Sequence, residues 1–147
     1  MNNYFLKTLF SILFIGLFTN TFSQTNEWII YYENEKISIE TKYQICEFSS
    51  TANQEIIIFR FTNLTNDILT LEYDTELSYG EQIVNTEQNG EESRKKIKIN
   101  KNEIIVTNCD SKWNEFNIFS AFIENKNKQK YIYLSQFELK NINTENE

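Results

Sequence analysis

Between Ile68 and Tyr79 the side chains alternate between two kinds, and this pattern limits the fold more than any other part of the chain. One set is mainly apolar and comprises Leu69, Leu71, Tyr73, Thr75, Leu77 and Tyr79. The other set is polar and comprises Thr70, Glu72, Asp74, Glu76 and Ser78. Successive side chains on a β-strand point to opposite faces of its sheet. The pattern therefore predicts one long strand with a buried face and a solvated face.

Strand and turn signals also fill the rest of the chain after Glu27, and no helical period is present there. Ile37 to Ile45 alternates in the same way, whereas Glu55 to Phe61 begins apolar on both faces, which is typical of a central strand. Further strands are predicted at Trp28–Tyr32, Ile97–Ile99, Ile104–Val106, Phe116–Ile123 and Tyr131–Leu139. Polar turns are predicted at residues 33–35, 63–67, 101–102 and 125–128, and a bulge or turn at Gly80.

A polar hairpin is predicted around Asn89-Gly90, a pair that favours a two-residue turn. Its arms are charged: Glu81 and Glu87 precede the turn, and residues 94–96 (Arg-Lys-Lys) follow it. Opposite charges that face each other across a hairpin attract. We therefore expect this hairpin to be exposed to solvent.

Seven or eight short strands separated by polar turns predict an all-β fold, an antiparallel sandwich or barrel formed by one domain. The pattern resembles the immunoglobulin-like sandwich in its general architecture. A true immunoglobulin domain has a Trp about a dozen residues after its first Cys and a Tyr two residues before its second. The corresponding positions hold Phe59 and Phe61, and Thr107. The resemblance therefore implies a sandwich and transfers no binding residue.

The first residues have the three parts of a cleavable secretory signal peptide. Lys7 supplies a positive charge, and Leu9 to Phe18 is almost wholly apolar. Thr21 and Ser23 are the small residues that precede the predicted cut after Ser23. An uncleaved membrane anchor is the alternative, but a spanning helix needs about 20 apolar residues, more than this run contains. No Cys lies at the cut, so lipid attachment is not indicated.

Cleavage would leave an exported β-sandwich domain at residues 24–142, followed by a tail at residues 143–147 that we expect to be disordered. The Ser-Gln ending of the leader resembles the signal peptides of exported Bacteroidota proteins. The many Ile, Asn and Lys residues resemble proteins from AT-rich genomes. This resemblance implies a periplasmic or secreted location, with no membrane span after cleavage, and it implies no activity.

Cys46 and Cys109 are the only cysteines in the chain. In an oxidising compartment an even pair most often forms a disulfide, which is our prediction. Two free thiols, or half of a metal site, are the alternatives. Because the chain has no His and no third Cys, a zinc site would need carboxylate ligands, which is uncommon for structural zinc.

The formal net charge of −7 makes the chain a poor partner for nucleic acid. Residues 1–23 carry one Lys and no acid, so the exported part has a net charge of about −8. Phosphate binding needs clustered Lys and Arg. The one basic cluster, residues 94–96 with Lys98, is surrounded by acids, and nucleic-acid binding is not expected.

The absence of His excludes the common catalytic arrangements, namely Ser-His-Asp and Cys-His nucleophiles and His-ligated catalytic zinc. With three Gly in the whole chain and no Gly-rich motif, a phosphate-binding loop or dinucleotide turn is not expected either. We therefore predict no cofactor, no metal and no catalytic residue, and we expect the protein not to be an enzyme.

The acids Glu72, Asp74 and Glu76 lie on one face of the predicted strand and form a candidate acidic face. Alternate residues on a strand are about 6.5–7 Å apart, which overlaps the carboxylate separation in inverting glycosidases. Three acids are also enough to bind calcium. A solvated sheet face explains the pattern best, since a catalytic pair needs one carboxyl whose pKa is raised by burial.

Five aromatic residues are a candidate ligand platform: Trp28, Tyr31, Tyr32, Tyr79 and Trp113. Such rings stack on a sugar or form the centre of a protein interface. Core packing is the competing interpretation, because most aromatic residues of a small sandwich are buried. Trp113 is the strongest candidate, since it lies among polar neighbours after Cys109.

We expect a non-catalytic exported protein that binds another macromolecule, a protein or a glycan, through its loops or an exposed strand edge. One alternative is an inhibitor or protective protein that is attracted to a basic extracytoplasmic enzyme by its net charge and acidic face. The other is a carboxylate-based glycan hydrolase that uses the same acids. Fold alone does not decide between these functions.

Overall fold

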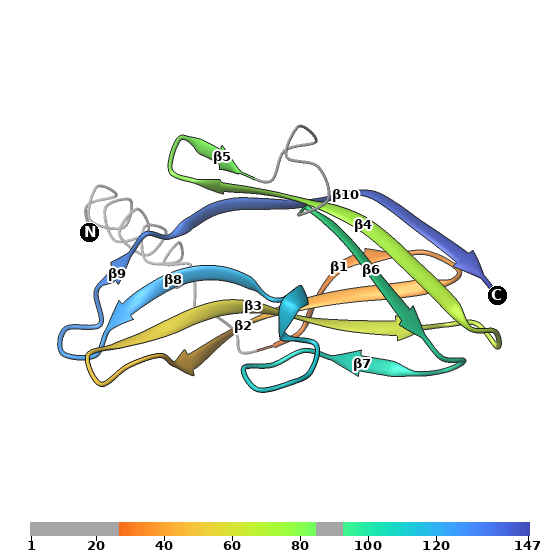
Figure 1. Ribbon diagram of the computed structural model, residues 1–147, viewed down its shortest axis with the longest axis horizontal. Coiled ribbons are helices and arrows are strands. Elements are labelled where there is room, and N and C mark those ends of the chain that lie inside the picture. Colours follow the sequence, from red (N-terminus) through yellow and green to blue (C-terminus); the bar gives the residue numbers. More distant parts are fainter. Residues whose placement is uncertain (1–26, 85–92) are drawn as a thin grey trace, which may run out of the picture.

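The computed structural model of the protein describes residues 27–84 and 93–147. These residues form ten β-strands and a short 3-10 helix at Asn114–Phe116. The strands are β1 (Ile29–Glu33), β2 (Ile37–Glu47), β3 (Ala52–Asn63), β4 (Leu69–Tyr79), β5 (Gln82–Val84), β6 (Arg94–Ile99), β7 (Ile104–Val106), β8 (Ile118–Glu124), β9 (Lys130–Tyr131) and β10 (Leu134–Asn146). They make two antiparallel sheets that lie one above the other as two layers (Figure 1).

The two sheets, A and B, are each organised around one long central strand. Sheet A has six strands: β1, β2, β3, β8 and β9 follow one another, and β7 pairs with β3 beyond the end of β8. Sheet B has four strands: β10, β4 and β5 follow one another, and β6 pairs with the other part of β4. β3 and β4 therefore each pair with three other strands and hold their own sheet together.

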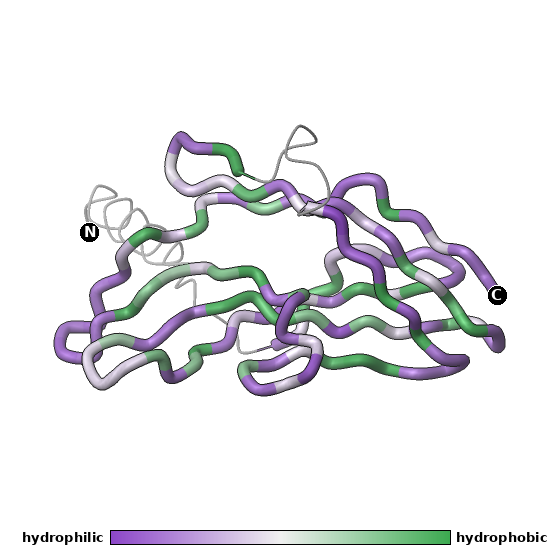
Figure 2. Tube along the Cα trace, viewed as in Figure 1, coloured by the Kyte–Doolittle hydropathy of each residue, from purple (hydrophilic) through white to green (hydrophobic). Residues whose placement is uncertain are grey.

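The main core fills the space between the two sheets. Alternate residues of the central strands enter it, including Phe59 and Phe61 of β3 and Leu71 and Tyr73 of β4, all of which are buried. Neighbouring strands add the buried residues Ile37, Ile39, Ile97, Ile99, Ile105 and Ile118. Burying one such side chain contributes about 1.5–3 kcal/mol, so the core stabilises the fold and fixes the register of the strands. In Figure 2 the hydrophobic colour marks the middle of β3 in the lower layer.

The fold class and the two clearest strand predictions are confirmed. β4 presents Leu69, Leu71 and Tyr73 to the core, as its alternation predicts, and β3 is a central strand with buried residues on both faces. Gly80 forms a turn, because its φ of 62° lies in the left-handed region that favours glycine. The chain reverses there into β5, a strand that the sequence pattern does not predict.

The prediction of one strand from Tyr131 to Leu139 is wrong. β9 ends at Tyr131 and pairs with β8 in sheet A, whereas β10 begins at Leu134 and pairs with β4 in sheet B. Ile132 between them has a φ of 47°, a conformation that a β-branched residue rarely adopts and that interrupts a strand. The apolar sequence at this point therefore crosses from one sheet to the other.

The predicted disordered tail at residues 143–147 is wrong as well, because these residues continue β10 to Asn146. Asn146 pairs with Leu69 of β4, and the amide of Glu147 donates a hydrogen bond to the carbonyl of Ile68 (3.0 Å). Polar residues are compatible with this position, since the outward side chains of an edge strand remain in water.

Other predicted segments differ in their bounds or lie outside the described residues. The strand expected from Phe116 starts at Ile118, after the 3-10 helix. The Asn89-Gly90 turn and the signal peptide at residues 1–23 both lie outside the described ranges. The predicted facing of residues 94–96 toward Glu81 and Glu87 is wrong, because residues 94–96 pair with residues 72–74 of β4. Within those ranges, no helix has the length and apolar character needed to cross a membrane.

Candidate functional site

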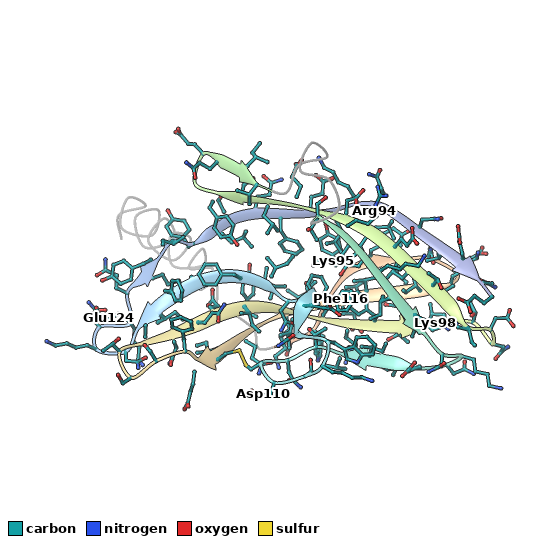
Figure 3. The ribbon with its side chains drawn as sticks, viewed as in Figure 1. Arg94, Lys95, Lys98, Asp110, Phe116 and Glu124 are labelled. Atoms are coloured by element: carbon teal, nitrogen blue, oxygen red, sulfur yellow. A yellow bond between two sulfur atoms is a disulfide. The ribbon has the colours of Figure 1, made fainter. Side chains whose placement is uncertain are left out.

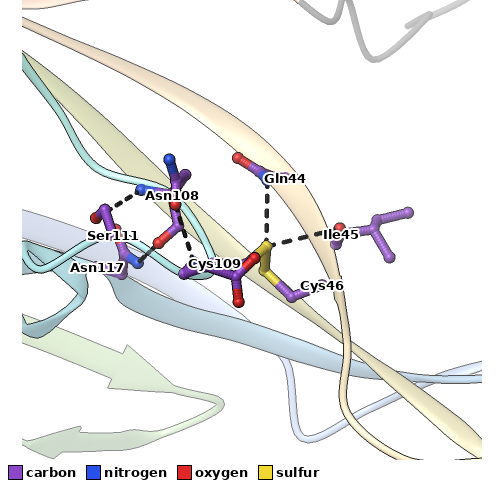
Figure 4. Close-up of a disulfide and its surroundings, with 8 residues drawn as sticks. Gln44, Ile45, Cys46, Asn108, Cys109, Ser111 and Asn117 are labelled. Carbon is purple, nitrogen blue, oxygen red and sulfur yellow. Dashed lines mark hydrogen bonds between the residues drawn. A yellow bond between two sulfur atoms is a disulfide. The ribbon is translucent and has the colours of Figure 1, made fainter.

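The disulfide between Cys46 and Cys109 ties β2 to the segment that follows β7, and it confirms the prediction for this pair. The two Cα atoms are 5.8 Å apart (Figure 4). Gln44 Nε2 donates a hydrogen bond to Cys109 Sγ (3.1 Å). Cys46 is buried in a small second core with Ile56 and Ile58. Because Ile56 and Ile58 alternate with main-core residues along β3, this second core lies on the outer face of sheet A.

Residues 107–117 form a segment that contacts both cores. Thr107 exchanges two hydrogen bonds with Phe59: its Oγ1 accepts from the Phe59 amide (2.8 Å), and its amide donates to the Phe59 carbonyl (2.9 Å). Cys109 packs against the second core, whereas Trp113 and Phe116 pack with the main core, their ring centroids 6.1 Å apart. Through Cys109 the segment therefore helps to cover the half of the outer face that holds the disulfide.

The other half of this outer face carries exposed aliphatic side chains. A row of directly opposite residues crosses four strands: Ile30 of β1, Glu40 of β2, Arg60 of β3 and Val106 of β7. Ile104, two residues earlier on β7, points the same way. Ile30, Ile104 and Val106 are 61%, 58% and 40% exposed. Solvated sheet faces are usually polar, so three exposed aliphatic side chains on one face are the exception.

An ion pair occupies the centre of this row. Arg60 donates hydrogen bonds to both carboxylate oxygens of Glu40, and the two side chains are 30% and 15% exposed. The guanidinium carbon lies 4.7 Å from the centroid of the Trp28 ring, and Lys42 Nζ lies 5.9 Å from it. Hydrogen bonding to Glu40 raises the pKa of Arg60. We call the surface formed by Trp28, Ile30, Glu40, Arg60, Ile104 and Val106 the sheet A face.

The outer face of sheet B carries the three acids that the sequence analysis singled out, and each has a cationic neighbour. The cross-strand ion pairs are Glu72–Lys96, Asp74–Arg94 (3.2 Å) and Glu76–Lys140 (2.8 Å). Asp74 also accepts a hydrogen bond from Asn141 Nδ2 (2.8 Å). Arg94 and Lys98 lie along β6 at the edge of this sheet (Figure 3). The face is therefore mixed in charge, and the described residues contain no group of three or more Asp, Glu, Cys or His arranged to hold a metal ion.

The five predicted platform residues are not brought together. Trp28 lies on the sheet A face, whereas Tyr31 and Tyr32 pack against the main core. A β-bulge between Ile30 and Tyr32 inserts Tyr31 as an extra residue, so both Tyr side chains turn inward. The Tyr31 hydroxyl accepts a hydrogen bond from the amide of Leu139 in sheet B (2.8 Å).

The other two platform candidates also contribute to packing. The Tyr79 hydroxyl donates to the carbonyl of Phe119 (2.8 Å), which links sheet B to sheet A. Trp113 packs against the main core, and Lys112 Nζ lies 4.6 Å from the centroid of its ring. The sequence does not reveal exposed residues such as Ile104, because alternation over a three-residue strand does not show which face is covered.

Comparison of the chain with protein-family models finds no matching family. Comparisons with curated proteins and with solved structures also find no match. What the protein binds is therefore inferred below from its own side chains.

Proposed function

We propose that the protein is a non-catalytic, exported binding protein that docks a protein partner on the sheet A face. The observation that carries this proposal is the exposure of Ile30, Ile104 and Val106 around the Glu40–Arg60 pair. Exposed apolar patches with polar surroundings are typical of protein-binding surfaces. The face also contains a Trp and an Arg, the residue types that most often dominate the energy of an interface.

A partner that covers the centre of this face would not isolate the charges of Glu40 and Arg60. Glu40 and Arg60 already hydrogen bond to each other, so removing water from them does not create an isolated buried charge. The aliphatic side chains around them would contribute about 25 cal/mol for each Å² of apolar surface removed from water. Both points favour a partner whose contact surface is apolar at its centre rather than strongly charged.

The disulfide supports the export that the leader predicts. Disulfide bonds persist in oxidising compartments such as the periplasm and the extracellular medium, and they are rare in the cytosol. The Cys46–Cys109 bridge therefore agrees with a protein that acts in one of those compartments.

The inhibitor and hydrolase alternatives have less support. Both depend on Glu72, Asp74 and Glu76 as an acidic surface, and each of these acids pairs with a Lys or Arg. Net charge is then the main reason to expect a basic target. Nucleic acid is not favoured either, because the basic residues of β6 face acids of β4.

Affinity capture with matched variants tests the proposal. Tagged protein is incubated with the extracytoplasmic fraction of its host and washed at low and high salt, and the retained proteins are quantified by mass spectrometry. Retention of a specific partner should survive high salt, because salt screens charged contacts more than apolar ones. Ile104→Asp should reduce that retention at least about tenfold, since it buries an unpaired charge in the interface.

The control variant is Ile83→Asp. Ile83 on β5 of sheet B is 58% exposed, the same as Ile104, so the two substitutions differ in location and not in chemistry. Ile83→Asp should leave retention unchanged. Equal loss in both variants, or no loss in either, would contradict a partner on the sheet A face. Light scattering of the purified protein identifies the case in which the partner is a second copy of this chain.

A further inference from the structure

The turn between β2 and β3 and the turn between β8 and β9 lie side by side at one end of sheet A (Figure 1). Asn125 joins them: its amide donates to the carbonyl of Thr51 (2.9 Å), and its Nδ2 donates to the carbonyl of Ser50 (3.2 Å). A hollow of about 680 Å³ opens between the two turns. The side chains that line it include Glu47, Phe48, Ser50, Asn53, Asn125 and Lys128. We call this feature the turn hollow.

Hydrogen bonds within each turn hold the walls of the turn hollow in place. The Ser49 amide donates to the carbonyl of Ala52 (2.9 Å), and Ser49 Oγ accepts from the amide of Ala52 (3.1 Å). In the second turn the Lys128 amide donates to the carbonyl of Glu124 (2.9 Å). A site that is already formed loses little conformational entropy when a ligand binds.

Phe48 places an open aromatic ring beside the turn hollow. Its side chain is 59% exposed, and its ring centroid lies 5.0 Å from that of Phe122. The ring of Phe122 in turn lies 4.8 Å from that of Phe119. Phe48 is therefore supported by other rings while much of its surface stays in water. The C–H faces of sugar rings stack on supported aromatic rings of this kind, because the contact removes apolar surface of both from water.

The polar side chains of the turn hollow retain hydrogen-bonding capacity. Within the described residues, the side chains of Glu47, Asn53 and Lys128 make no hydrogen bond or ion pair. The set thus offers both donors and acceptors. A sugar hydroxyl is a donor and an acceptor at once, so it matches a mixed set of this kind.

The charges of the turn hollow narrow the ligand class. Glu47 and Lys128 contribute one charge of each sign, so the lining has no net attraction for an anion or a cation. A phosphate group would require an excess of cations, and Glu47 would repel it. A volume on the order of 300–1,000 Å³ is usual for small-ligand sites, and the turn hollow lies within that range.

We infer that the turn hollow binds a short neutral oligosaccharide. Phe48 stacks on a sugar ring, and the side-chain amide of Asn53 hydrogen bonds to its hydroxyl groups. This site is separate from the sheet A face, because Asn53 lies at the opposite end of β3 from Thr62, which pairs with Ile104. The inference therefore does not depend on the proposed protein partner.

Titration with defined sugars tests this inference. The isotope-labelled, disulfide-bonded protein is titrated with cellohexaose, maltohexaose, xylohexaose and chitohexaose, and amide NMR shifts are followed. At least one sugar should bind, with a dissociation constant on the order of 1 mM, and should shift the amides of residues 47–53 and 125–128. Phe48→Ala should weaken that binding at least about tenfold, and Asn53→Ala about fivefold.

Tyr133→Ala is the matched control, because Tyr133 is also a highly exposed aromatic residue (62%) but does not line the turn hollow. It should bind the same sugar with unchanged affinity. Thermal unfolding of each variant checks that the fold is retained, and Asn53→Ala provides the second test if Phe48→Ala is unstable. The inference would be overturned if none of the four sugars bound. It would also be overturned if the Phe48→Ala and Asn53→Ala variants bound the sugar as tightly as the unchanged protein.

Discussion

The outer faces of the two sheets differ in the side chains that they expose to water. On sheet B, cross-strand ion pairs join β4 to two of its three neighbours, β6 and β10. On sheet A, one ion pair between Glu40 and Arg60 lies among the exposed side chains of Ile30, Ile104 and Val106. The outer face of sheet B is thus mainly paired charges, with Ile83 exposed on β5, whereas that of sheet A groups three exposed aliphatic side chains that a partner would stabilise by covering.

The edge strands show the same contrast. The register of β10 in sheet B shifts between Lys140 and Asn143, where Asn141 has a φ of 53°. Such a bulge, together with outward charges, keeps an edge strand from pairing with other chains. β7 of sheet A instead has exposed aliphatic residues, Ile104 and Val106, at two of its three positions. The edge strand β7 therefore offers apolar surface to another chain, whereas the edge strand β10 does not.

The disulfide lies in the covered half of the sheet A outer face, and its removal should have the largest effect. The double variant Cys46→Ala and Cys109→Ala releases a closure that spans 63 residues. In the chain-entropy description this costs about 4 kcal/mol of unfolding free energy. Urea unfolding measures it, and reduction of the unchanged protein should give a similar loss. A loss below about 1 kcal/mol would show that the covered half does not depend on the bridge.

Two isoleucines on the same outer face test whether its halves differ. Ile58 is 4% exposed in the second core, whereas Ile30 is 61% exposed on the sheet A face. Ile58→Ala should lower the free energy of unfolding by about 3 kcal/mol, because it leaves a cavity. Ile30→Ala should change it by no more than about 0.5 kcal/mol. Similar losses in urea unfolding for both variants would mean that Ile30 is not a free surface residue.

Two glutamates compare the ion pairs of the two sheets. Glu40→Gln leaves the part-buried Arg60 without its charged partner and should cost about 1 kcal/mol, a value reduced by the water that still reaches Arg60. Glu72 is the charged partner of Lys96 and is more exposed than Glu40. Glu72→Gln should therefore leave the urea midpoint unchanged within error. The contrast between the faces would be weakened if Glu72→Gln had the larger effect.

The smallest predicted effect concerns Glu147, next to the last residue of β10. A hydrogen bond from Lys98 holds the pKa of this carboxyl below its usual range. Because the folded pKa is the lower one, the contact stabilises the chain end above the unfolded pKa and is lost as pH falls through the folded pKa. Carbon NMR should show Glu147 titrating below an ordinary glutamate, and Lys98→Met should raise its pKa toward the ordinary value, with Thr70 and Lys96 still lowering it. An unchanged titration midpoint of Glu147 in the Lys98→Met variant would contradict the contact between these two side chains.

Long alternating strands were predictable from the sequence, and short or crossing elements were not. The pattern of β4 identifies its buried face because five of the six alternate positions are apolar or aromatic, and the composition of β3 identifies a central strand. The crossing at Ile132 has no sequence signal, since an Ile with positive φ is rare and its apolar neighbours continue the strand pattern. The ordered end of β10 was missed because a polar segment is stable as a strand only when β4 pairs with it.

The candidate sites depend on tertiary contacts that a single sequence does not contain. The bulge beside Tyr32 turns two predicted platform residues inward, and no turn residue marks it. The acids of β4 are neutralised by β6 and β10, which approach from distant parts of the chain. The disulfide was predictable because the chain offers only one pairing of its two cysteines.

Site-specific photo-crosslinking in the host tests the contrast between the two faces most directly. A photoreactive phenylalanine analogue replaces Val106 on the sheet A face in one strain and Lys98 on the outer face of sheet B in another. Position 106 should give a discrete adduct with a partner protein, and position 98 should give none. Adducts at position 98 alone, or equally at both positions, would contradict the assignment of the binding surface to sheet A.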